Sequence, residues 1–485
     1  MGVALFTLIM TFSPLAAAQE TSQRVSASTA HTSYAAVRMM ESSIGNIQAR
    51  QTTTSDTAAR TARRIYVFEN GDQFQSVQVQ PTGGSTGTIL LDTVLLTGEN
   101  LQVRYYDGTQ LKTEKVVSGA TYQLDNLYFS TDTMSAVVSR PVCYTDLEYE
   151  SIELQQQYPA TITVVSTARG YSIRFTAPAA PMGSHYEHFT LVGKGQLIDW
   201  SRSTAATEWG AFQLRDKNRW TYRGYYYKAP SNYLPSGDQV YYRIPVSYIP
   251  IKMLACEDPA AQELAIPMLD VMTELQNEAG YFPTHAGSEW LMNAYQIAPG
   301  FYDTRFSTDM ALGLLTAYEK YGISEFLTAA QAYGDYFLDY TEKNHRVCVD
   351  QKSGEEGWLV EDYHSPDGNL PVHTSLNHQL SECYFLFRLE QATGNAAYGE
   401  RAEQMTAGLT ILGTRWIKPD GNLWYSISPN GTFGGVEYPY LTYNDLFDLQ
   451  NMLQIRSGAR NPILQQLMDS KLIWMQKNGI TGYKR

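Results

Sequence analysis

Short apolar or alternating runs dominate the sequence between residues 64 and 150. RIYVFEN, TILLDTVLL, NLQVRYYDG, TYQLDNLYF and SAVVSRPVCY follow one another, with Gly, Asn and Asp turns between them. Alternation of this kind places every second side chain on one face of a strand, so the pattern predicts a small β-domain over residues 64–150. ATITVVS, YSIRFTA, HFTLVGKGQLIDW and WTYRGYYYK continue it, and predict a second β-rich domain over residues 151–257.

The apolar spacing changes after Asp258-Pro259. Stripes at i, i+3 and i+4 run through AAQELAIPMLDVMTELQ, STDMALGLLTAYEKYG, ISEFLTAAQAYGDYFLDYTEK, PVHTSLNHQLSECYFLFRLEQATG and AAYGERAEQMTAGLTILGTRW, and several of these end at Gly. Short turns alternate with long, Gly- and aromatic-rich loops between the helices, which favours an (α/α) toroid over residues 258–485, with a plain helical bundle as the alternative. The predicted fold class is multidomain α+β: N-terminal β-rich domains followed by a C-terminal (α/α) toroid.

The first residues resemble an export signal. VALFTLIMTF is an apolar run of signal-peptide length, and Ala16-x-Ala18 offers a cleavage site, so residues 1–18 are predicted to be a signal peptide and the mature chain to start near Gln19. The protein is therefore expected to be secreted or extracytoplasmic. The usual positive residues before the apolar run are missing, which leaves an uncleaved anchor as the alternative. Residues 19–63 are rich in Ser, Thr, Ala and Gln and predict a flexible lead-in.

The amino-acid composition limits the classes of partner that the protein is expected to bind. The net charge of −13 argues against a nucleic-acid partner, which ordinarily requires a basic surface. Tyrosine outnumbers phenylalanine 35 to 17, a balance that suits flat, hydrogen-bonding surfaces such as those that bind sugar rings. The four cysteines fall in no C-x-x-C spacing, so no metal is predicted; Cys348 and Cys383 are the preferred pair if a disulfide forms. A monomer and a homodimer both fit the sequence.

Three helix-linked blocks carry a family resemblance. They are NEAGYFPTHAG…IAPGFYDTRFSTDMALGLLTAY, GWLVEDYHSPDGNLPVHTSLNHQLSECYFLFRL and DGNLWYSISPNGTFGGVEYPYLTYNDLFDLQNML. In this order, over residues 260–456, they resemble the C-terminal domain of the D-glucuronyl C5-epimerases. That family has an N-x-x-G-G-W-P-like turn with a P-G-W-Y-S-A-like helix start, an E-E-Y-P-like loop, and a Y-D-L-R-H-like strand before a D-Y-H-T-T-H-like helix start.

The resemblance implies a function and a site. The implied activity is inversion of C5 in hexuronic acid residues of a polysaccharide, by removal of a proton on one face and its return on the other, with no cofactor. The implied catalytic residues are Tyr425, Tyr440 and Glu361. A phenol is a poor base in water, so one tyrosine must be activated by a neighbouring cation or hydrogen bond while the other stays protonated as the acid.

The sequence departs from the family where the intermediate must be neutralised. YSISP replaces the Arg-His after the strand tyrosine, and YLTYN replaces the two histidines of Y-H-T-T-H. Tyr302 and Arg305, in GFYDTRF, are therefore candidate substrate-binding residues, with His364 or His373 assisting. The alternative, purely structural interpretations are that the tyrosines pack at the rim of the toroid and that Arg305 pairs with Asp303 or Asp309 at a helix start.

A basic, aromatic stretch suggests how the substrate is bound. RDKNRWTYRGYYYK places Trp220, Tyr222 and Arg223 among other cations, which suits an anionic polysaccharide, although a solvated β-hairpin is an equal alternative. Two other functions fit the sequence. A uronate polysaccharide lyase starts with the same proton abstraction, and Asn377, His378 and Arg305 fit its carboxylate neutralisation. A non-catalytic glycan-binding protein is favoured by the missing Arg and His positions.

Overall fold

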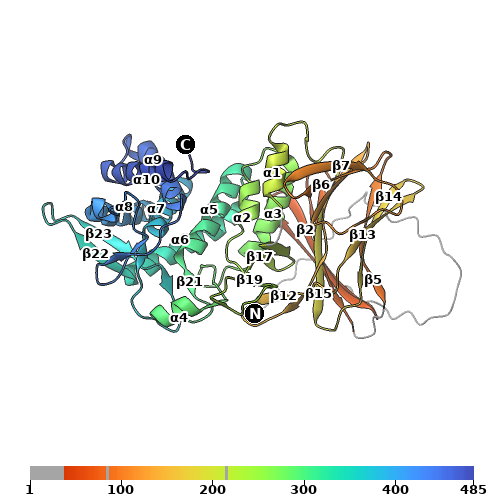
Figure 1. The fold of residues 1–485 in the computed structure, drawn as a ribbon, viewed down its shortest axis with the longest axis horizontal. Helices are drawn as coiled ribbons and strands as arrows, with labels where there is room; N and C mark the ends of the chain where they lie inside the picture. Colours follow the sequence, from red (N-terminus) through yellow and green to blue (C-terminus); the bar gives the residue numbers. More distant parts are fainter. Residues whose placement is uncertain (1–37, 83–86, 214–216) are drawn as a thin grey trace, which may run out of the picture. The chain divides into compact units, whose positions relative to one another are not determined.

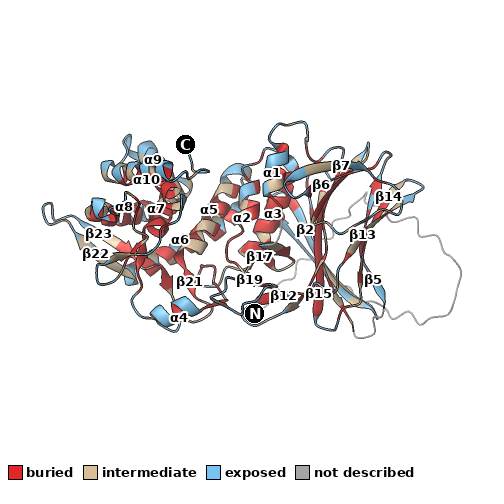
Figure 2. Cartoon of the chain, viewed as in Figure 1, coloured by how far each residue is buried: buried red, intermediate tan, exposed pale blue. Residues whose placement is uncertain are grey.

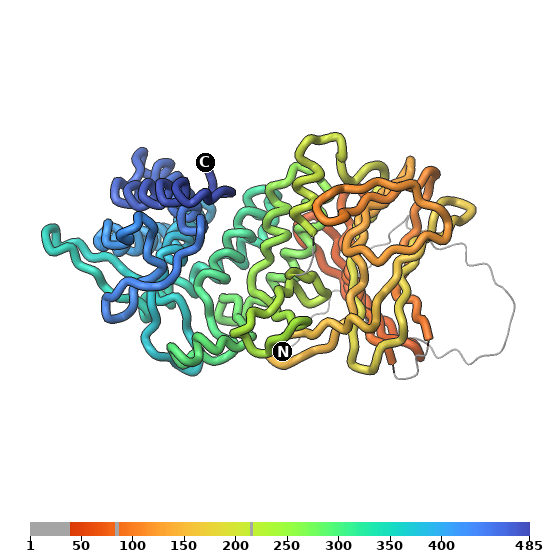
Figure 3. The backbone as a smooth tube through the Cα atoms, in the orientation of Figure 1, coloured from red at the N-terminus to blue at the C-terminus, as the bar shows by residue number. Residues whose placement is uncertain are grey.

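Strands fill the N-terminal part of the chain and helices the C-terminal part, as the hydrophobic pattern predicts (Figure 1). The structure is a computed structural model, and it describes residues 38–82, 87–213 and 217–485. These residues belong to one compact unit. The predicted signal peptide and residues 19–37 of the predicted lead-in lie outside the described residues. Figure 3 follows the chain from the strands into the helices.

The larger sheet is antiparallel and, among the described residues, has 14 strands. Its main order is β1-β2-β3-β4-β15-β11-β12-β19-β17-β16, while β10 joins it through β15, and β9, β6 and β7 follow β10. The strands are β1 (Arg38–Ile44), β2 (Ile47–Ser55), β3 (Ala59–Val67), β4 (Gln73–Pro81), β6 (Gln102–Asp107), β7 (Gln110–Lys115), β9 (Asn126–Ser130), β10 (Met134–Ser139), β11 (Val142–Asp146), β12 (Ser151–Leu154), β15 (Ser184–Lys194), β16 (Asn218–Thr221), β17 (Gly224–Lys228) and β19 (Val240–Arg243).

A second sheet packs on the first and encloses an apolar core. Its order is β5 (Thr88–Thr97), β14 (Gly170–Pro178), β13 (Thr161–Thr167) and β8 (Thr121–Tyr122). The alternation in β5 buries Leu91 and Leu96 and leaves Leu95 at the surface. The buried side chains meet Val77 and Val138 of the larger sheet in one cluster. Figure 2 shows the buried residues along the strands. Burying each of these side chains contributes about 1.5–3 kcal/mol.

The predicted domain boundaries in the β-rich part are wrong in two places. Residues 38–63 of the expected flexible lead-in form β1, β2 and most of β3. Their polar, Thr-rich sequence is compatible with strands because the hairpin is held by cross-strand backbone pairing, Arg38↔Thr53 through Ile44↔Ile47, with little core to fill. The boundary at residue 150 does not separate two domains, since β15 pairs with β4 and β14 pairs with β5. Local alternation reveals strands but not their distant partners.

The helical part begins with α2 (Tyr248–Met253) and α3 (Pro259–Thr273), followed by three helical hairpins among the described residues. Helices α5, α7 and α9 contact one another in that order, and each packs against the helix that follows it, α6, α8 or α10. This (α/α) arrangement matches the predicted toroid in part. The helices are α1 (Ala205–Ala211), α4 (Glu289–Tyr295), α5 (Thr304–Tyr321), α6 (Ser324–Lys343), α7 (Leu376–Thr393), α8 (Ala396–Leu412), the 3-10 turn η1 (Gly413–Trp416), α9 (Leu441–Ser457) and α10 (Pro462–Lys477).

The helix ends follow the sequence signals. Helices α5, α7 and α9 end at Gly322, Gly394 and Gly458, each in the left-handed conformation that closes a helix. Asp303 caps the start of α5 by accepting a hydrogen bond from the backbone N–H of Phe306. No helix within residues 38–82, 87–213 and 217–485 has the length and apolar content needed to cross a membrane. The four cysteines are free thiols, so the preferred pair of Cys348 and Cys383 is not formed.

Polar contacts join the larger sheet to α3. The Tyr66 hydroxyl donates to Asp270 Oδ2 at 2.7 Å. Arg64 donates to both carboxylate oxygens of Glu274, at 2.5 and 2.8 Å. Arg64 is buried while Glu274 is 45% exposed, so the strength of this pair comes from its two-point geometry. Strand β3 therefore fixes the first long helix of the helical part.

Candidate functional site

The loops before α5, α7 and α9 meet at the N-terminal ends of these helices. Strand β21 (Tyr302–Asp303) pairs with β24 (Tyr363–His364), and β25 (Thr374–Ser375) pairs with β26 (Ser426–Ile427), which pairs with β27 (Phe433–Gly434). Strands β21 and β25 lead directly into α5 and α7. The remaining short pairs are β18 (Tyr233–Leu234) with β20 (Gly287–Ser288) and β22 (His345–Val349) with β23 (Glu356–Val360). Segments far apart in sequence thereby contribute side chains to one place.

A buried carboxylate and two histidines form the centre of this place. Asp362 accepts a hydrogen bond from the Ser375 N–H at 2.8 Å, and its Oδ2 lies 3.1 Å from His373 Nε2 and 3.7 Å from His378 Nδ1. Burial alone would raise the pKa of Asp362, but His378, His373 and Ser375 outweigh it and hold this pKa below its ordinary value. Asp362 is therefore an ionised carboxylate inside the protein.

His373 connects Asp362 to a phenol. Its second ring nitrogen, Nδ1, lies 2.7 Å from the Tyr295 hydroxyl. The Asp362 carboxylate, 3.1 Å from Nε2, favours a proton on Nε2, which leaves Nδ1 to accept the proton of the phenol. Burial raises the pKa of Tyr295, and so do the nearby Asp362 and Glu361. Tyr295, His373 and Asp362 thus form a proton-transfer chain of the kind that activates a hydroxyl through an oriented imidazole.

Tyr425 lies on the same histidine. Its ring centroid is 5.9 Å from that of His373 and 6.1 Å from that of Tyr438. Burial raises the pKa of Tyr425 and Asp362 raises it further, although Ser375 and Tyr363 act in the opposite direction. The phenol therefore keeps its proton at neutral pH and can act as a proton donor.

One glycine of the 421–440 loop, Gly435, is explained by Tyr425. Gly435 has φ +84°, and a Cβ there would stand 2.8 Å from Cβ and Cδ1 of Tyr425. Only glycine allows the loop to turn and to lie flat on this ring. Glu437 then fixes the next residues, because its Oε1 accepts hydrogen bonds from the Tyr438 N–H at 2.7 Å and from the Thr442 hydroxyl at 2.6 Å. Tyr438, 47% exposed, is where the cluster reaches the surface.

Asp303 is a second buried carboxyl at the site. Its Oδ1 caps α5, and burial raises the pKa of Asp303 to about 7, with a further contribution from the charge of Asp362. The Asp303 charge in turn raises the pKa of Tyr438 and of Tyr363, after burial. The site thus contains two carboxyls whose pKa values are shifted in opposite directions. Asp362 is held ionised, and Asp303 is held neutral below about pH 7.

An aromatic edge borders the site. Trp290, on α4, is 45% exposed, and its ring meets those of Tyr295, Tyr363 and His373 at centroid distances of 6.1, 6.1 and 5.9 Å. Exposed aromatic rings beside polar groups offer flat surfaces on which the apolar face of a sugar can stack. The arrangement can therefore hold a ring next to acid and base groups.

Two of the three predicted catalytic residues lie at the site, and the third does not. Tyr425 lies in the cluster, and Glu361, half-buried with a pKa raised by burial, lies near Asp362 and His373. Tyr440 precedes α9, is 40% exposed, and points toward the chain end, where its Cε1 is 4.0 Å from a Cβ built at Gly482. Among the described contacts, the tyrosines that meet Tyr425 are Tyr438 and Tyr363, not Tyr440.

The cation predicted from the first loop is already neutralised. Arg305, whose side chain is 11% exposed, donates to Asp309 Oδ1 at 2.9 Å and to Asp445 at 2.8 and 3.1 Å. It also donates to the backbone oxygen of Asn377 at 2.9 Å, and Asn377 itself is buried. Arg305 lines a hollow of about 220 Å³, but its charge is balanced there by two aspartates. Tyr302 is a core residue, since its hydroxyl lies 2.9 Å from that of Tyr333 and its side chain is fully buried.

The basic, aromatic stretch lies in the larger sheet. Residues 218–228 form the predicted hairpin of β16 and β17. Trp220 is 5% exposed, Tyr222 carries the guanidinium of Arg64 4.6 Å above its ring, and Arg223 pairs with Asp146. Arg215 of this stretch lies outside the described residues. No described contact joins Trp220, Tyr222 or Arg223 to the Tyr425 cluster, so the structure does not bring these predicted residues together with the catalytic candidates.

Sequence reasoning noted His373 as an assistant but missed Tyr295, Asp303, Tyr363, Tyr438 and Trp290. For two of them a signal was present. Tyr363 is the tyrosine of the E-E-Y-P-like loop, of which only the glutamate was used. Glu437-Tyr438 is an acidic residue followed by tyrosine, the order of the D-Y in D-Y-H-T-T-H. Tyr295 and Trp290 carried no such signal.

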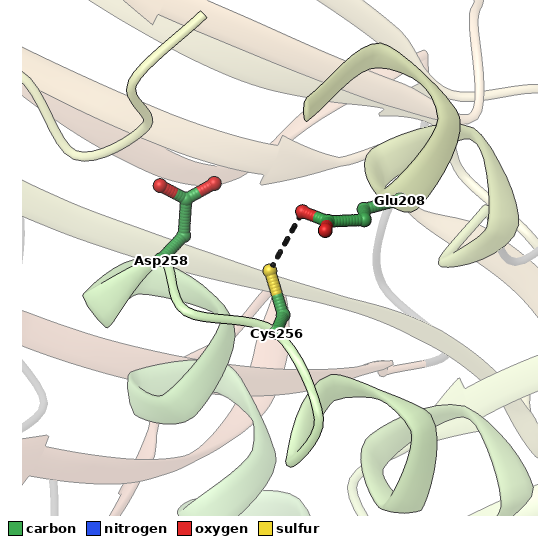
Figure 4. A group of neighbouring side chains, drawn as sticks. All are labelled: Glu208, Cys256 and Asp258. Carbon is green, nitrogen blue, oxygen red and sulfur yellow. Dashed lines mark hydrogen bonds between the residues drawn. The ribbon is translucent and has the colours of Figure 1, made fainter. Parts of the chain in front are cut away.

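One group of side chains in the described residues has the spacing of metal ligands, and Figure 4 shows it. It consists of Glu208, Cys256 and Asp258, with the Cys256 thiol 3.2 Å from Glu208 Oε2. A guanidinium already fills it, because Arg202 donates to Glu208 Oε2 at 2.8 Å and to Asp258. The group is therefore explained as an arginine-binding cluster.

No protein-family model and no curated protein matches the sequence. Solved structures match in part. A D-mannose isomerase shares 11% identity over 47% of this chain and 59% of its own, with a TM-score of 0.35. A family 76 glycoside hydrolase from a bovine Bacteroides thetaiotaomicron strain shares 11% identity over 83% of this chain and 75% of its own, with a TM-score of 0.39. A cellobiose 2-epimerase from Bacillus thermoamylovorans B4167 shares 8% identity over 57% of this chain and 69% of its own, with a TM-score of 0.39.

The matched part of this chain thus spans less than two thirds of the mannose isomerase. With identities this low and TM-scores below 0.5, these matches assign no activity to the chain.

Proposed function

We propose that this protein is a carbohydrate-active enzyme that inverts C5 of hexuronic acid residues in a polysaccharide, the reaction of the D-glucuronyl C5-epimerases that its loops resemble. The observation that carries the proposal is that one histidine, His373, contacts two tyrosines in different environments. Tyr295 is hydrogen-bonded to His373 Nδ1, and His373 Nε2 faces the Asp362 carboxylate. Tyr425 faces the same ring and is held protonated.

In this proposal Tyr295 is the base and Tyr425 the acid. Tyr295 passes its proton to His373 Nδ1 as its phenol oxygen removes the C5 proton, and the Asp362 charge stabilises the imidazolium that forms. Tyr425 then returns a proton to C5 from the other face, and becomes the phenolate. Tyr295 now carries the proton taken from C5, so the Tyr425 phenolate and the His373 imidazolium remain to be reset. A turnover in the reverse sense, or transfer of the imidazolium proton to the phenolate through water, restores both. This arrangement supplies the activation that a phenol base requires.

The intermediate carries extra negative charge on the substrate carboxylate, which must be stabilised. Arg305 is unsuited to this role because Asp309 and Asp445 already neutralise it. Asp303, with its pKa near 7, can instead donate a hydrogen bond as a neutral acid. Trp290 and Tyr438, both partly exposed, supply surfaces for the sugar ring.

A glycoside hydrolase is the second candidate, and the two carboxyls favour it. Asp303 has a raised pKa and Asp362 a lowered one, which is the division between general acid and base or nucleophile that glycosidases use. It ranks second because Asp362 is fully buried behind His373 and Ser375, where a sugar cannot reach it directly.

Incubation of the protein with uronic-acid polysaccharides in deuterated water tests the proposal. An epimerase incorporates deuterium at C5 and yields both C5 epimers, as seen by NMR. A lyase produces an unsaturated uronate that absorbs in the ultraviolet, and a hydrolase produces new reducing ends without deuterium at C5. Either product pattern, or no change with any uronate polymer, overturns the epimerase proposal.

A further inference from the structure

A buried lysine lies next to the 421–440 loop, outside the cluster around His373. Lys471, on α10, is 0% exposed. Burial lowers the pKa of Lys471 to about 8, while the charge of Glu437 acts in the opposite direction. Lys471 is therefore an ammonium at neutral pH. Removing such a charge from water is unfavourable unless the charge has polar partners, so the partners of Lys471 indicate its role.

The Lys471 ammonium joins the two ends of the 421–440 loop. Its Nζ donates to Asn422 Oδ1 at 2.7 Å, at the start of the loop, and to the backbone oxygen of Tyr438 at 2.8 Å, near its end. The preceding residue of α10 adds a contact at the start, because the Ser470 hydroxyl donates to the backbone oxygen of Gly421 at 2.8 Å. One turn of α10 thus holds both ends of the loop that carries Tyr425.

Apolar packing contributes little to the position of the loop end. Within residues 434–440, all of which the structure describes, Glu437 is the one buried residue, and Val436 is 90% exposed. The backbone of Tyr438 is held instead by two polar contacts. Its N–H donates to Glu437 Oε1 at 2.7 Å, and its oxygen accepts from Lys471. Loss of either contact should free the Tyr438 backbone on one side.

The position of Tyr438 matters to the site because its ring is partly exposed and faces another aromatic ring. The ring centroid of Tyr438 is 6.1 Å from that of Tyr425. A shift of the Tyr438 backbone therefore moves a surface that the site can offer to a sugar, and removes a neighbour of the Tyr425 phenol.

A lysine suits this junction for a chemical reason. An ammonium has three N–H donors on one compact, rotatable group, so a single nitrogen can bind acceptors from two segments of the chain. An apolar side chain of similar length would fill the same space but would remove a donor from Asn422, which is 6% exposed, and from Tyr438.

We propose that Lys471 is a positioning residue of the candidate site, which ties the end of the 421–440 loop to its start and thereby sets the place of Tyr438 beside Tyr425. Lys471 acts through Tyr438 and touches neither the substrate nor the reacting atoms. Its importance for turnover rests on the proposed function, whereas its hold on the loop does not.

Hydrogen–deuterium exchange of the free, full-length protein tests the hold on the loop without any substrate. Lys471→Met keeps an unbranched apolar stem and removes the donors. In this variant the backbone amides of residues 421–440, followed by mass spectrometry, should exchange about tenfold faster or more than in the wild type, because the loop opens locally. The amides of α7 should keep their wild-type rates.

Two further variants separate the contact from folding. Lys477→Met changes an exposed lysine on the same helix and should leave both sets of amides unchanged. Asn422→Ala leaves Lys471 in place and removes one acceptor, so it should speed exchange at the start of the loop. This variant decides the question if Lys471→Met does not fold.

The kinetics of C5 proton exchange separate positioning from a purely structural role. Loss of folded protein lowers kcat and leaves KM unchanged, whereas a displaced binding surface raises KM. Lys471→Met should raise KM about fivefold or more, and should have little further effect in a Tyr438→Ala background, since both changes act on the same surface.

Each result decides the proposal. Wild-type exchange of the loop amides in Lys471→Met, or in Asn422→Ala where Lys471→Met does not fold, overturns it, and so does a lowered kcat with an unchanged KM. Failure of the proposed function is seen separately, in the wild type. Absence of C5 exchange with any uronate polymer rejects the epimerase, while the amide exchange of the loop still decides whether Lys471 holds Tyr438.

Discussion

His373 is the residue on which the candidate site depends. Its Nδ1 is hydrogen-bonded to Tyr295, and its buried Nε2 faces Asp362 at 3.1 Å, so the imidazole cannot itself reach a substrate. The role of His373 is to accept the proton of Tyr295. A phenol with a raised pKa can act as a base only when a neighbouring group accepts its proton. Among the described residues no hydrogen bond joins the Tyr425 hydroxyl to an imidazole nitrogen, so the same logic makes Tyr425 the proton donor.

Removing one phenolic oxygen tests these roles. Tyr295→Phe and Tyr425→Phe should each lower the rate of C5 proton exchange by about 10²–10⁴-fold, because a proton-transfer group is lost while the ring stays. The double variant should be scarcely slower than the slower single variant, as expected of groups that act as a unit. Deuterium incorporation measured by NMR provides the rates.

Tyr440→Phe is the matched control for this series. The Tyr440 ring lies against the chain end at Gly482, so its hydroxyl should be dispensable. Exchange lost in Tyr440→Phe but kept in Tyr425→Phe and Tyr295→Phe would return the catalytic role to the position that the family resemblance implies.

Asp303 should make stability depend on pH. The carboxyl keeps its proton up to about pH 7 when folded, but only to its ordinary pKa of 3.8 when unfolded. Its stabilising contribution is therefore complete below pH 3.8 and is lost as the pH rises through about 7. Asp303→Asn cannot ionise but still offers an oxygen to cap α5. The free energy of unfolding of the wild type, minus that of the variant, should thus fall with rising pH across this interval, as denaturant titrations would measure. Parallel pH profiles would contradict the raised pKa.

At the scale of elements, strands and helices could be predicted from the sequence, but their pairing could not. The change to helical spacing at Pro259 and the glycine stops of α5, α7 and α9 are local signals. The pairing of β4 with β15 spans more than a hundred residues of sequence, and nothing in either strand specifies it. The candidate site was predictable to the same extent. Tyr425, Glu361 and His373 lie in loops that the motifs mark, whereas Tyr295 reaches His373 only because α4 folds beside the second loop.

The 421–440 loop should depend on one of its two adjacent glycines. Gly435→Ala places a Cβ 2.8 Å from Tyr425 at a φ of +84°, so it should destabilise the protein by roughly 1–2 kcal/mol and slow exchange by displacing the phenol. Gly434→Ala is the control, since a Cβ there has no atom within 4 Å. Thermal unfolding and exchange rates compare the two. Equal effects of both changes would mean that the loop does not hold Tyr425.

At the scale of the whole molecule, the sheet and the helices should unfold together because β3 is tied to α3. Arg64 is buried and binds Glu274 at two points, and Tyr66 binds Asp270 beside it. Arg64→Met keeps the apolar stem but leaves the carboxylate unpaired, so it should lower the free energy of unfolding by about 1–3 kcal/mol. Arg60→Met, an exposed position on the same strand, should change it by less than about 0.5 kcal/mol. Circular dichroism followed in the strand and helix regions should show one coincident transition, shifted to lower temperature only in Arg64→Met. If the helical signal instead melts at its wild-type temperature while the strand signal shifts, the two parts are stabilised separately and the contact with α3 does not couple them.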